Sequence, residues 1–235
     1  MNTPDEKKKF VREKFSAISK DYDFLNSLLS LNIDRYWRWV TTRMLREYPE
    51  GVVLDLCAGT LPLALELTRQ AKKRRVVAVD FCELMLRAGI STLPKDERRD
   101  RIFPVCGDGE KIPVATDSCQ GVTVAFGLRN LGRAQEGLNE MQRVLKRGGK
   151  LLVLEFSRPR NPLVKPFYNF YLNRVLPKLA GLISGDKEAY EYLASSIAKF
   201  YEPEELLAMM RQAGFREAYR RPLTFGIVSI YVGIK

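Results

Sequence analysis

The sequence predicts an α/β fold with a parallel sheet at its centre, and two observations carry this prediction. From Gly51 onward, short apolar runs typical of buried strands alternate with stretches whose apolar residues recur at helical spacing. The first apolar run, 52–56, is followed by a turn at Gly59 and by a helical pattern over 61–71. Strand, turn and helix in this order favour parallel strands joined by right-handed crossovers.

The elements are expected in a regular order. A helical segment over 5–47 comes first, with Asp34 as the N-cap of its last helix and an apolar stripe formed by Trp37, Trp39, Val40 and Met44. Strands and helices then alternate, with strands at 52–57, 76–79, 101–105, 120–126 and 150–156 and helices at 61–71, 83–90 and 134–145. Arg147-Gly148-Gly149 stops the last of these helices. Strand 150–156 is nearly all apolar, which favours a central position in the sheet.

Residues 157–200 interrupt this alternation. Prolines at 159, 162, 166 and 177 break the pattern, and aromatic residues cluster there, so we expect an insertion of short helices. Two interpretations stay open for it: a helical lid on the sheet edge, or an apolar wall for a large hydrophobic substrate. A helix over 203–213 follows, and strands 216–221 and 224–235 are expected to form an antiparallel hairpin at the edge of the sheet.

The composition excludes several kinds of site. None of the 235 residues is histidine, which excludes Ser-His-Asp triads, a histidine base and histidine metal ligands. The four cysteines have no Cys-x-x-Cys spacing, so we expect reduced thiols and no metal site; they are Cys57, Cys82, Cys106 and Cys119. No apolar run approaches the ~20 residues of a membrane-spanning helix, and the polar start of the chain does not resemble a signal peptide, which predicts a cytoplasmic protein.

The net charge of +11 points to a negatively charged partner. Nucleic acid and an anionic membrane surface both fit this charge. The basic residues are scattered in small clusters, however, and neither an RNP-type motif nor zinc-finger spacing is present. We therefore expect no nucleic-acid partner and a peripheral contact with an anionic membrane at its inner face. The sequence leaves a homo-oligomer open.

Three carboxylates, Asp55, Asp80 and Asp108, are expected at the ends of consecutive strands, where α/β sheets bind ligands. Gly59 lets the backbone approach a ligand, and Asp80 is suited to accept hydrogen bonds from two ribose hydroxyls. The sequence offers few backbone amides for binding a pyrophosphate, because the Gly-x-Gly-x-x-Gly pattern is missing and Pro62 removes an amide from the start of the helix. The carboxylates suit the cationic sulfonium of S-adenosylmethionine better, which favours a methyltransferase over an enzyme of the NAD type.

Several motifs are similar to those of one enzyme family. They are Ala17-Ile-Ser-Lys-Asp-Tyr-Asp-Phe-Leu-Asn26, Leu54-Asp-Leu-Cys-Ala-Gly-Thr60, Ala125-Phe-Gly-Leu-Arg-Asn130, Leu152-Val-Leu-Glu-Phe-Ser157, Val175-Leu-Pro-Lys-Leu-Ala-Gly181, Tyr192-Leu-Ala-Ser-Ser-Ile197 and Gly226-Ile-Val-Ser-Ile-Tyr-Val-Gly233. The run Phe126-Gly-Leu-Arg-Asn130 is the most specific, because generic methyltransferases lack it. From about Phe15 to the C-terminus the chain resembles the UbiE-type C-methyltransferases of ubiquinone and menaquinone biosynthesis.

The resemblance implies a class I S-adenosylmethionine-dependent methyltransferase fold, Rossmann-like, with a seven-stranded sheet whose last strand is antiparallel. It implies one domain in which 1–48 is a helical cap, 49–156 the cofactor-binding core, 157–200 a substrate-side insertion and 201–235 a C-terminal helix and hairpin. It also implies a role for each site residue. Thr60 and its turn would hold the methionine part, Asp80 the ribose, and Asp108 and Gly109 the adenine, while Ala125 would lie near the cofactor, Tyr22 would close over it, and Arg129 and Asn130 would face an isoprenoid quinol.

The chain departs from the family at two places. Leu61-Pro62 stands where the family usually has Gly-Asp, so the Leu61 side chain must be accommodated where the family has none, which bears on the affinity for the cofactor. Asp34 stands where the family often has a histidine, so any role of that imidazole is absent or replaced.

The reaction implied is methyl transfer to a ring carbon that becomes nucleophilic when the neighbouring hydroxyl loses its proton. Arg129, which is always charged, is expected to stabilise the phenolate, and Asn130 to orient the ring. The alternative for Arg129 is an ion pair with a carboxylate that pins the loop.

Two other functions stay open: methylation of another hydrophobic phenol, and a non-catalytic scaffold whose cofactor site is lost through Leu61-Pro62. A nucleic-acid methyltransferase is disfavoured, because the Asn/Asp-Pro-Pro-Tyr signature is missing.

Overall fold

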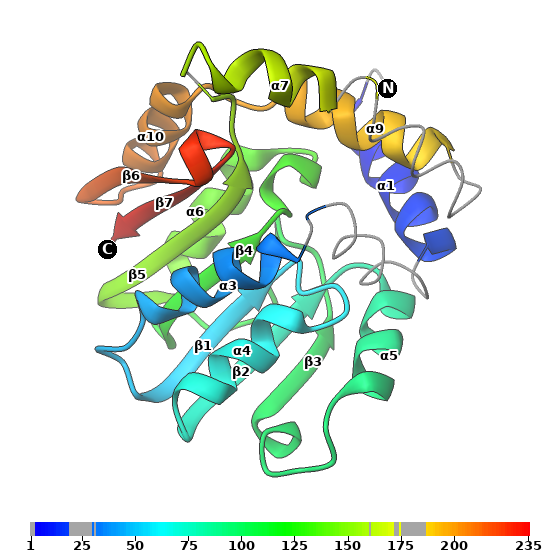
Figure 1. Ribbon diagram of the computed structural model, residues 1–235. Coiled ribbons are helices and arrows are strands. Elements are labelled where there is room, and N and C mark those ends of the chain that lie inside the picture. The colour runs from blue at the N-terminus through cyan, green and yellow to red at the C-terminus, as the bar shows by residue number, and fades with distance from the viewer. Residues whose placement is uncertain (1–2, 19–29, 31, 160, 172–173, 175–186) are drawn as a thin grey trace.

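A seven-stranded sheet forms the centre of the protein (Figure 1). The computed structural model describes residues 3–18, 30, 32–159, 161–171, 174 and 187–235. The strands are β1 (Glu50–Leu56), β2 (Lys73–Asp80), β3 (Ile102–Cys106), β4 (Cys119–Ala125), β5 (Leu145–Phe156), β6 (Glu217–Leu223) and β7 (Val228–Ile234). Their order in the sheet is β3-β2-β1-β4-β5-β7-β6, and β7 runs antiparallel to both of its neighbours. The expected parallel sheet with an antiparallel last strand is confirmed.

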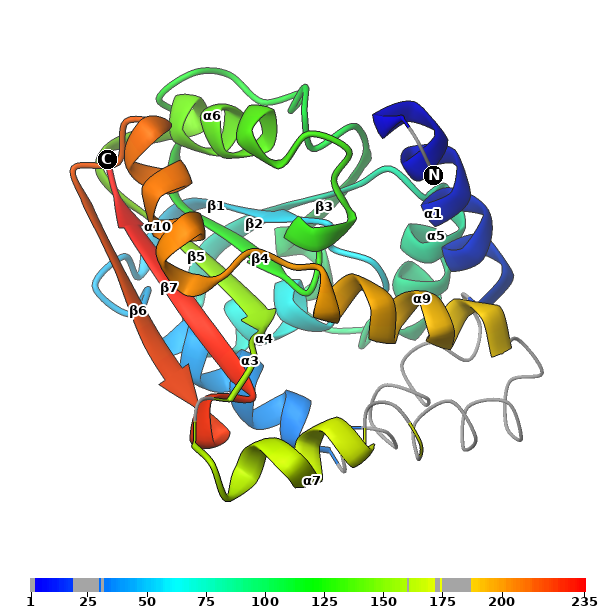
Figure 2. The ribbon, with the colours of Figure 1, turned by 90° about the horizontal axis from the view of Figure 1, so that it is seen from above.

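Helices cover both faces of this sheet. They are α1 (Pro4–Ile18), α3 (Ile33–Arg43), α4 (Pro62–Gln70), α5 (Glu83–Thr92), α6 (Ala134–Val144), α7 (Val164–Phe170), α9 (Lys187–Ala198) and α10 (Pro203–Gln212). Short 3₁₀ turns occur at η1 (Arg99–Arg101), η2 (Leu128–Asn130) and η4 (Thr224–Gly226). As Figures 1 and 2 show, α3 and α4 lie on one face and α6 and α10 on the other.

Alternate residues of the central strands enter two separate apolar cores. One core joins Leu54, Val122 and Val153 to residues of α6 and α10, and the other joins Val53, Val76 and Leu152 to residues of α3, α4 and α5. Because the central strands are covered on both faces, their sequences are apolar at nearly every position. This explains the continuous apolar runs from which the strands were predicted.

The C-terminal hairpin forms as expected, with a difference in its placement. β7 lies between β5 and β6, so that only β6 is at the edge. β5 is also longer than expected. It begins at Leu145, directly after α6, so that Arg147, Gly148 and Gly149 lie within the strand; Gly148 has a φ of 76°. The register with β4 shifts in this stretch. β5 is an interior strand, whereas β4 is the middle strand of the sheet.

Two expectations about α3 were wrong. Asn32, in the left-handed region, is the N-cap residue, and Asp34 lies buried in the first turn instead. The apolar stripe is also narrower than predicted: Trp37 and Val40 are buried, whereas Trp39 is exposed and stacks on Tyr36. Asp34 accepts hydrogen bonds from Arg38 and from the hydroxyl of Ser30, and these partners offset the cost of burying its carboxylate.

The helices α1, α7 and α9 lie around the edge of the sheet at which the parallel strands end (Figures 1 and 2). Phe10 of α1 packs edge-on against Tyr192 of α9, with ring centroids 5.3 Å apart. The Lys7 ammonium of α1 donates a 2.7 Å hydrogen bond to the carbonyl oxygen of Leu131. In the part of the chain that the structure describes, each helix is too short or too polar to cross a bilayer.

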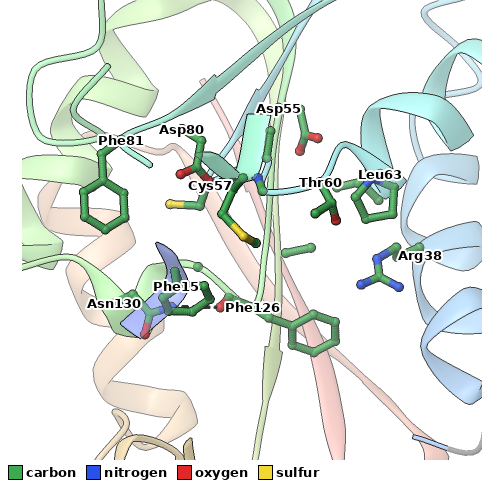
Figure 3. Close-up of a pocket in the computed structure, with 16 residues that line it drawn as sticks. Phe15, Arg38, Asp55, Cys57, Thr60, Leu63, Asp80, Phe81, Phe126 and Asn130 are labelled. Carbon is green, nitrogen blue, oxygen red and sulfur yellow. Dashed lines mark hydrogen bonds between the residues drawn. The ribbon is translucent and has the colours of Figure 1, made fainter. Parts of the chain in front are cut away.

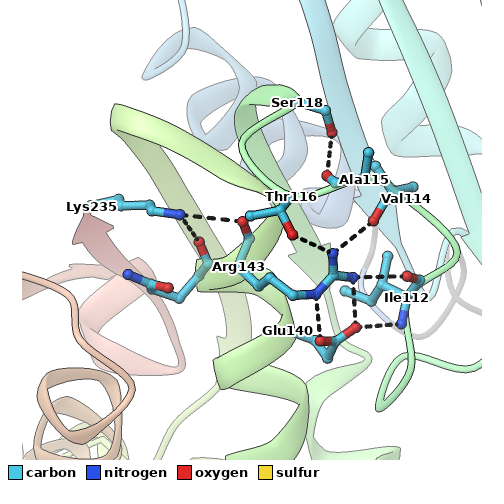
Figure 4. A network of polar contacts seen from close by, with 9 residues as sticks. Ile112, Val114, Ala115, Thr116, Ser118, Glu140, Arg143 and Lys235 are labelled. Carbon is cyan, nitrogen blue, oxygen red and sulfur yellow. Dashed lines mark hydrogen bonds and ion pairs between the residues drawn. The ribbon is translucent and has the colours of Figure 1, made fainter.

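The segment between β3 and β4 is fastened to α6 by Arg143 (Figure 4). Its guanidinium donates to both carboxylate oxygens of Glu140 and to the carbonyl oxygens of Ile112 and Val114, at 2.6 to 3.0 Å. Glu140 in turn accepts a 2.8 Å hydrogen bond from the Ile112 amide. These contacts fix the loop whose first residues carry Asp108.

Candidate active site

A tight turn after β1 forms the floor of the site. Cys57, Gly59 and Leu61 all have positive φ, between 53° and 69°. The Ala58 amide donates to the carbonyl oxygen of Val79, and the Leu61 amide donates to that of Ala58. This compact path reverses the chain between β1 and α4 and ties it to the end of β2.

Asp80 connects the ends of β1 and β2. Its Oδ2 accepts a 2.8 Å hydrogen bond from the Gly59 amide, and its Oδ1 accepts one of 2.8 Å from the Cys82 amide. Burial raises the pKa of this carboxyl, and the two backbone amides act in the opposite direction. Each carboxylate oxygen keeps a further lone pair for a hydroxyl donor.

Two adjoining hollows open at this edge of the sheet. The first, drawn in Figure 3, is lined by Phe15, Arg38, Asp55, Cys57, Ala58, Gly59, Thr60, Pro62, Leu63, Asp80, Phe81, Met85, Ala125, Phe126, Gly127 and Asn130. The second is lined by residues of α1 and by Cys57, Asp80, Phe81, Gly107, Asp108, Gly109 and Asn130. Its volume of about 570 Å³ lies within the ~300–1,000 Å³ usual for small-molecule sites. Asp80 lines both hollows and so stands at their junction.

The arrangement matches the three parts of a nucleoside with an amino-acid tail. Asp55, Gly59, Thr60 and Ala125 line only the first hollow, whereas Asp108 and Gly109 line only the second. Asp80 lies between them. Eight of the ten predicted site residues, Asn130 included, therefore line these two hollows, Arg129 does not, and Tyr22 lies outside the described residues.

Asp55 is a fully buried carboxylate at the back of the first hollow. Its Oδ1 accepts a 3.0 Å hydrogen bond from the Thr123 hydroxyl, whereas Oδ2 has no side-chain hydrogen-bond partner among the described residues. Burial raises the pKa of Asp55 to about 7 against the opposing effects of Thr123 and Arg38, and the nearby Asp80 adds to the increase.

The second hollow has a roof that sequence reasoning missed. The Lys8 ammonium of α1 lies 2.8 Å from a carboxylate oxygen of Asp108 and 2.8 Å from one of Glu110. The guanidinium of Arg12, also on α1, lies 5.5 Å from the ring centroid of Phe81. Residues 7–9 look like an ordinary basic cluster in the sequence, and only the fold brings them above two carboxylates about 100 positions away.

The Leu61 side chain, which replaces the usual glycine of the family, is accommodated outside the first hollow. Its side chain is completely buried in the core formed with α3, α4 and α5 and is not among the residues that line the first hollow. The positive φ turns this side chain away from the hollow and toward Gly89 of α5, where an added Cβ would lie 2.9 Å from Leu61 Cγ. The Leu61 side chain therefore fits at this position because residue 89 is a glycine without a Cβ.

Arg129 and Asn130 lie on η2 but face different surroundings. The Arg129 guanidinium is 2.9 Å from Glu155, which is fully buried, and it also donates to the carbonyl oxygen of Phe126. It lines a third hollow with Lys7 and Tyr192. Asn130 lines both hollows around Asp80 and accepts a 3.2 Å hydrogen bond from the Tyr192 hydroxyl. The ion pair that the sequence offered as the alternative for Arg129 is thus present.

Arg38, Glu155 and Tyr192 are further residues of this region that sequence reasoning did not assign to the site. Glu155 could have been found, because it is the one carboxylate within the apolar strand 151–156. Arg38 is placed four residues after Asp34, a spacing that allows an ion pair on one helical face. Nothing local marks Tyr192, whose contact with Asn130 spans 62 positions.

Comparison with solved structures agrees with this fold. A methyltransferase of Aquifex aeolicus that depends on S-adenosylmethionine superposes with a TM-score of 0.58 at 17% identity, over 83% of this chain and 89% of that one. A Methanococcus maripaludis protein described as a methyltransferase of the same cofactor dependence gives 0.64 at 16%, over 92% and 91%. At these identities the likeness concerns the fold alone. The sheet order and the acidic turn region define a class I S-adenosylmethionine-dependent methyltransferase.

Sequence comparison gives the family. The model of the ubiE/COQ5 methyltransferase family matches residues 1–235. A Geobacter sulfurreducens protein named ubiquinone/menaquinone biosynthesis C-methyltransferase UbiE is 43% identical over 98% of this chain and 90% of its own length. A Porphyromonas gingivalis protein named demethylmenaquinone methyltransferase is 40% identical over 96% and 92%. The chain belongs to the ubiE/COQ5 methyltransferase family.

Proposed function

We propose that the protein transfers the methyl group of S-adenosylmethionine to a ring carbon of an isoprenoid quinol, either demethylmenaquinol or the related ubiquinone precursor. The observation that carries the proposal is the position of Asp80 between two hollows, with Asn130 facing both. The family and the names of the relatives point to the same reaction.

The cofactor is assigned across the two hollows. Thr60 and Asp55 take the methionyl end in the first hollow, Asp80 accepts from the ribose hydroxyls, and Asp108 with Gly109 flanks the adenine in the second. Ala125, at the end of β4, lies along the first hollow. When bound, the cofactor supplies an electrophilic methyl group on a cationic sulfur, and the buried carboxylates stabilise that charge.

The quinol ring is assigned to the side of the site where Asn130 and Tyr192 meet. Their 3.2 Å hydrogen bond fixes the Asn130 amide, which can then orient a ring hydroxyl. Arg129 lies on η2 next to Asn130. Its side chain is only 5% exposed, and its Nε has no hydrogen-bond partner among the described residues. A fixed positive charge there stabilises the phenolate that makes the ring carbon nucleophilic.

The role of Arg129 is tested by the pH dependence of kcat in Arg129→Lys and Arg129→Ala. If the guanidinium stabilises the phenolate, its removal moves the rising limb of the profile to higher pH, and the lysine variant moves it less. If Arg129 only pins the loop to Glu155, kcat falls while the limb stays in place, and the assigned role is wrong.

The reaction itself is tested with purified protein, S-adenosylmethionine and the two quinols. We expect a ring-methylated product from demethylmenaquinol, from the benzoquinol precursor, or from both. Cofactor binding without methylation of either would favour the alternative of another hydrophobic phenol. Absence of cofactor binding by calorimetry would favour the scaffold.

The exposed face of α7 supports the proposed contact with an anionic membrane. Leu163, Phe167 and Phe170 follow at helical spacing and are 77, 78 and 62% exposed, and Phe225 of the neighbouring η4 is 77% exposed. Figures 1 and 2 show η4 beside the start of α7. Lys165 of α7, Arg174 four residues after this helix, and Arg221 near the end of β6 are exposed as well. Aromatic side chains flanked by basic ones are typical of surfaces that bind anionic lipid interfaces.

Vesicle sedimentation tests this contact. We expect the protein to pellet with vesicles that contain phosphatidylglycerol and much less with neutral phosphatidylcholine vesicles. The double variant Phe167→Ser/Phe225→Ser should bind the anionic vesicles at least about tenfold more weakly, since each buried aromatic side chain contributes ~1.5–3 kcal/mol. Phe103→Ser, on β3 at the other edge of the sheet, is the control. Equal pelleting of all three proteins would contradict the contact.

A further inference from the structure

Arg38 is a charged side chain in the wall of the first hollow that has no part in the proposed methyl transfer. Its side chain is 11% exposed. The guanidinium lies 5.9 Å from the ring centroid of Phe126, and its Nε is buried without a hydrogen-bond partner among the described residues. A buried guanidinium with an unused donor is costly unless a ligand accepts from it.

Asp34 holds this guanidinium in one direction. The two residues are one helical turn apart on α3, and Arg38 donates from Nη1 to Oδ2 of Asp34. Asp34 is itself buried and accepts a 2.8 Å hydrogen bond from the Ser30 hydroxyl through its other oxygen. Arg38 lines the hollow, and the ion pair leaves its Nε as a donor without a partner among the described residues, available to a ligand carboxylate.

The position of Arg38 along the hollow identifies the part of the ligand that it meets. Figure 3 shows Arg38, Thr60 and Leu63 at one end and Phe81 and Asn130 at the other. The second hollow, where the nucleoside is assigned, adjoins the end with Phe81 and Asn130. Arg38 therefore lies at the methionyl end, where Asp55 also has an oxygen without a side-chain partner.

We infer that Arg38 binds the α-carboxylate of the methionyl end of the cofactor, while Asp55 binds the α-ammonium. One positive and one negative side chain in the same small hollow match an amino-acid zwitterion, and neither a phosphate nor a quinol has both charges. The inference rests on the proposed position of the cofactor and assigns a ligand specificity to the first hollow. The hollow selects S-adenosyl amino acids over nucleoside thioethers that lack the amino-acid group.

Calorimetry with two ligands tests the inference. S-Adenosylhomocysteine carries the amino-acid group, and 5′-methylthioadenosine shares the nucleoside and the sulfur but lacks it. In Arg38→Met we expect the affinity for S-adenosylhomocysteine to fall about 10- to 100-fold, as for loss of a hydrogen-bonded charge pair. The affinity for 5′-methylthioadenosine should stay within about twofold of the wild-type value. Arg43→Met is the matched control, because Arg43 is on the same helix but packs on Trp39 outside the hollow.

The design separates the inference from its alternatives. The ratio of the two affinities, measured on one sample, does not depend on the fraction of folded protein, and Arg38→Lys keeps a partner for Asp34 if the methionine variant is unstable. We expect the lysine variant to lie between wild type and Arg38→Met in this ratio. An unchanged ratio in both variants would overturn the inference while leaving the proposed function intact. Failure of the wild-type protein to bind either ligand would overturn both.

Discussion

The carboxylate of Glu155 and the guanidinium of Arg129 form an ion pair inside the protein, although 26 residues separate them in the sequence. Glu155 also accepts the Arg129 backbone amide at 3.2 Å, so the β5 strand holds both the side chain and the backbone of η2. This double attachment sets the loop on which Asn130 reaches the cofactor hollows.

Removal of Glu155 should therefore be costly. In Glu155→Ala the free energy of unfolding is expected to fall by ~3–5 kcal/mol, because a buried guanidinium loses its partner. Urea denaturation measures the change. Glu83→Ala is the control, since Glu83 forms an exposed pair with Arg87 that should contribute no more than ~1 kcal/mol. Equal effects of the two substitutions would show that the buried pair contributes no more to the free energy of unfolding than an exposed pair.

Gly89 should tolerate no larger residue. A Cβ there would lie 2.6 Å from the carbonyl carbon and oxygen of Thr60 and 2.9 Å from Leu61 Cγ. Gly89→Ala is thus expected to destabilise the protein by ~1–3 kcal/mol and to weaken binding of S-adenosylhomocysteine, because the turn that carries Thr60 must move. Thermal unfolding and calorimetry measure the two effects, with Ser91→Ala on the exposed side of α5 as the comparison. Wild-type affinity in Gly89→Ala would refute the coupling between α5 and the turn.

Cofactor binding should depend on pH through Asp55. Its pKa is raised to about 7 by burial, against Thr123, Arg38 and the Ala64 amide and with Asp80. A carboxyl with a raised pKa takes up a proton on folding, so its contribution to the stability of the ligand-free protein is largest at low pH and falls as the pH rises from about 4 to about 7. Binding of an ammonium needs the ionised form.

The affinity for S-adenosylhomocysteine is therefore expected to decrease up to about tenfold for each pH unit below 7, with release of up to about one proton on binding. Calorimetry in two buffers of different ionisation enthalpy measures that proton. The same titration with 5′-methylthioadenosine, which has no ammonium, should show a smaller dependence. Identical pH profiles for the two ligands would exclude Asp55 as the ammonium site.

The roof formed by α1 should slow the release of the nucleoside. Lys8→Ala removes the contacts with Asp108 and Glu110, so S-adenosylhomocysteine is expected to dissociate about two- to fivefold faster, as for loss of a partly exposed ion pair. Stopped-flow displacement measures the rate. Lys72→Ala, an exposed lysine between α4 and β2, should leave it unchanged. A Lys8→Ala rate equal to that of wild type would mean that α1 does not restrain the ligand.

Local sequence patterns were enough to predict the strands, most of the helices and the carboxylates at the strand ends. The apolar pattern of a strand or helix reflects which of its own faces is buried, so it can be recognised from neighbouring residues alone. The same patterns could not predict the direction of Leu61, which follows from a positive φ and the space above Gly89. They also suggested Asp34 as an N-cap, since a short acidic residue before a helix is equally suited to a cap and to a buried partner.

The sequence by itself thus determined the sheet with its covering helices and the family to which the chain belongs, because periodicity and contiguous motifs are properties of neighbouring residues. The tertiary structure alone decided which charges meet: Arg129 with Glu155, and Lys8 with Asp108. Which charges meet depends on how whole elements approach one another. For Arg129 and Glu155 burial makes the pairing strong as well, because an ionised group removed from water is stable only beside an opposite charge.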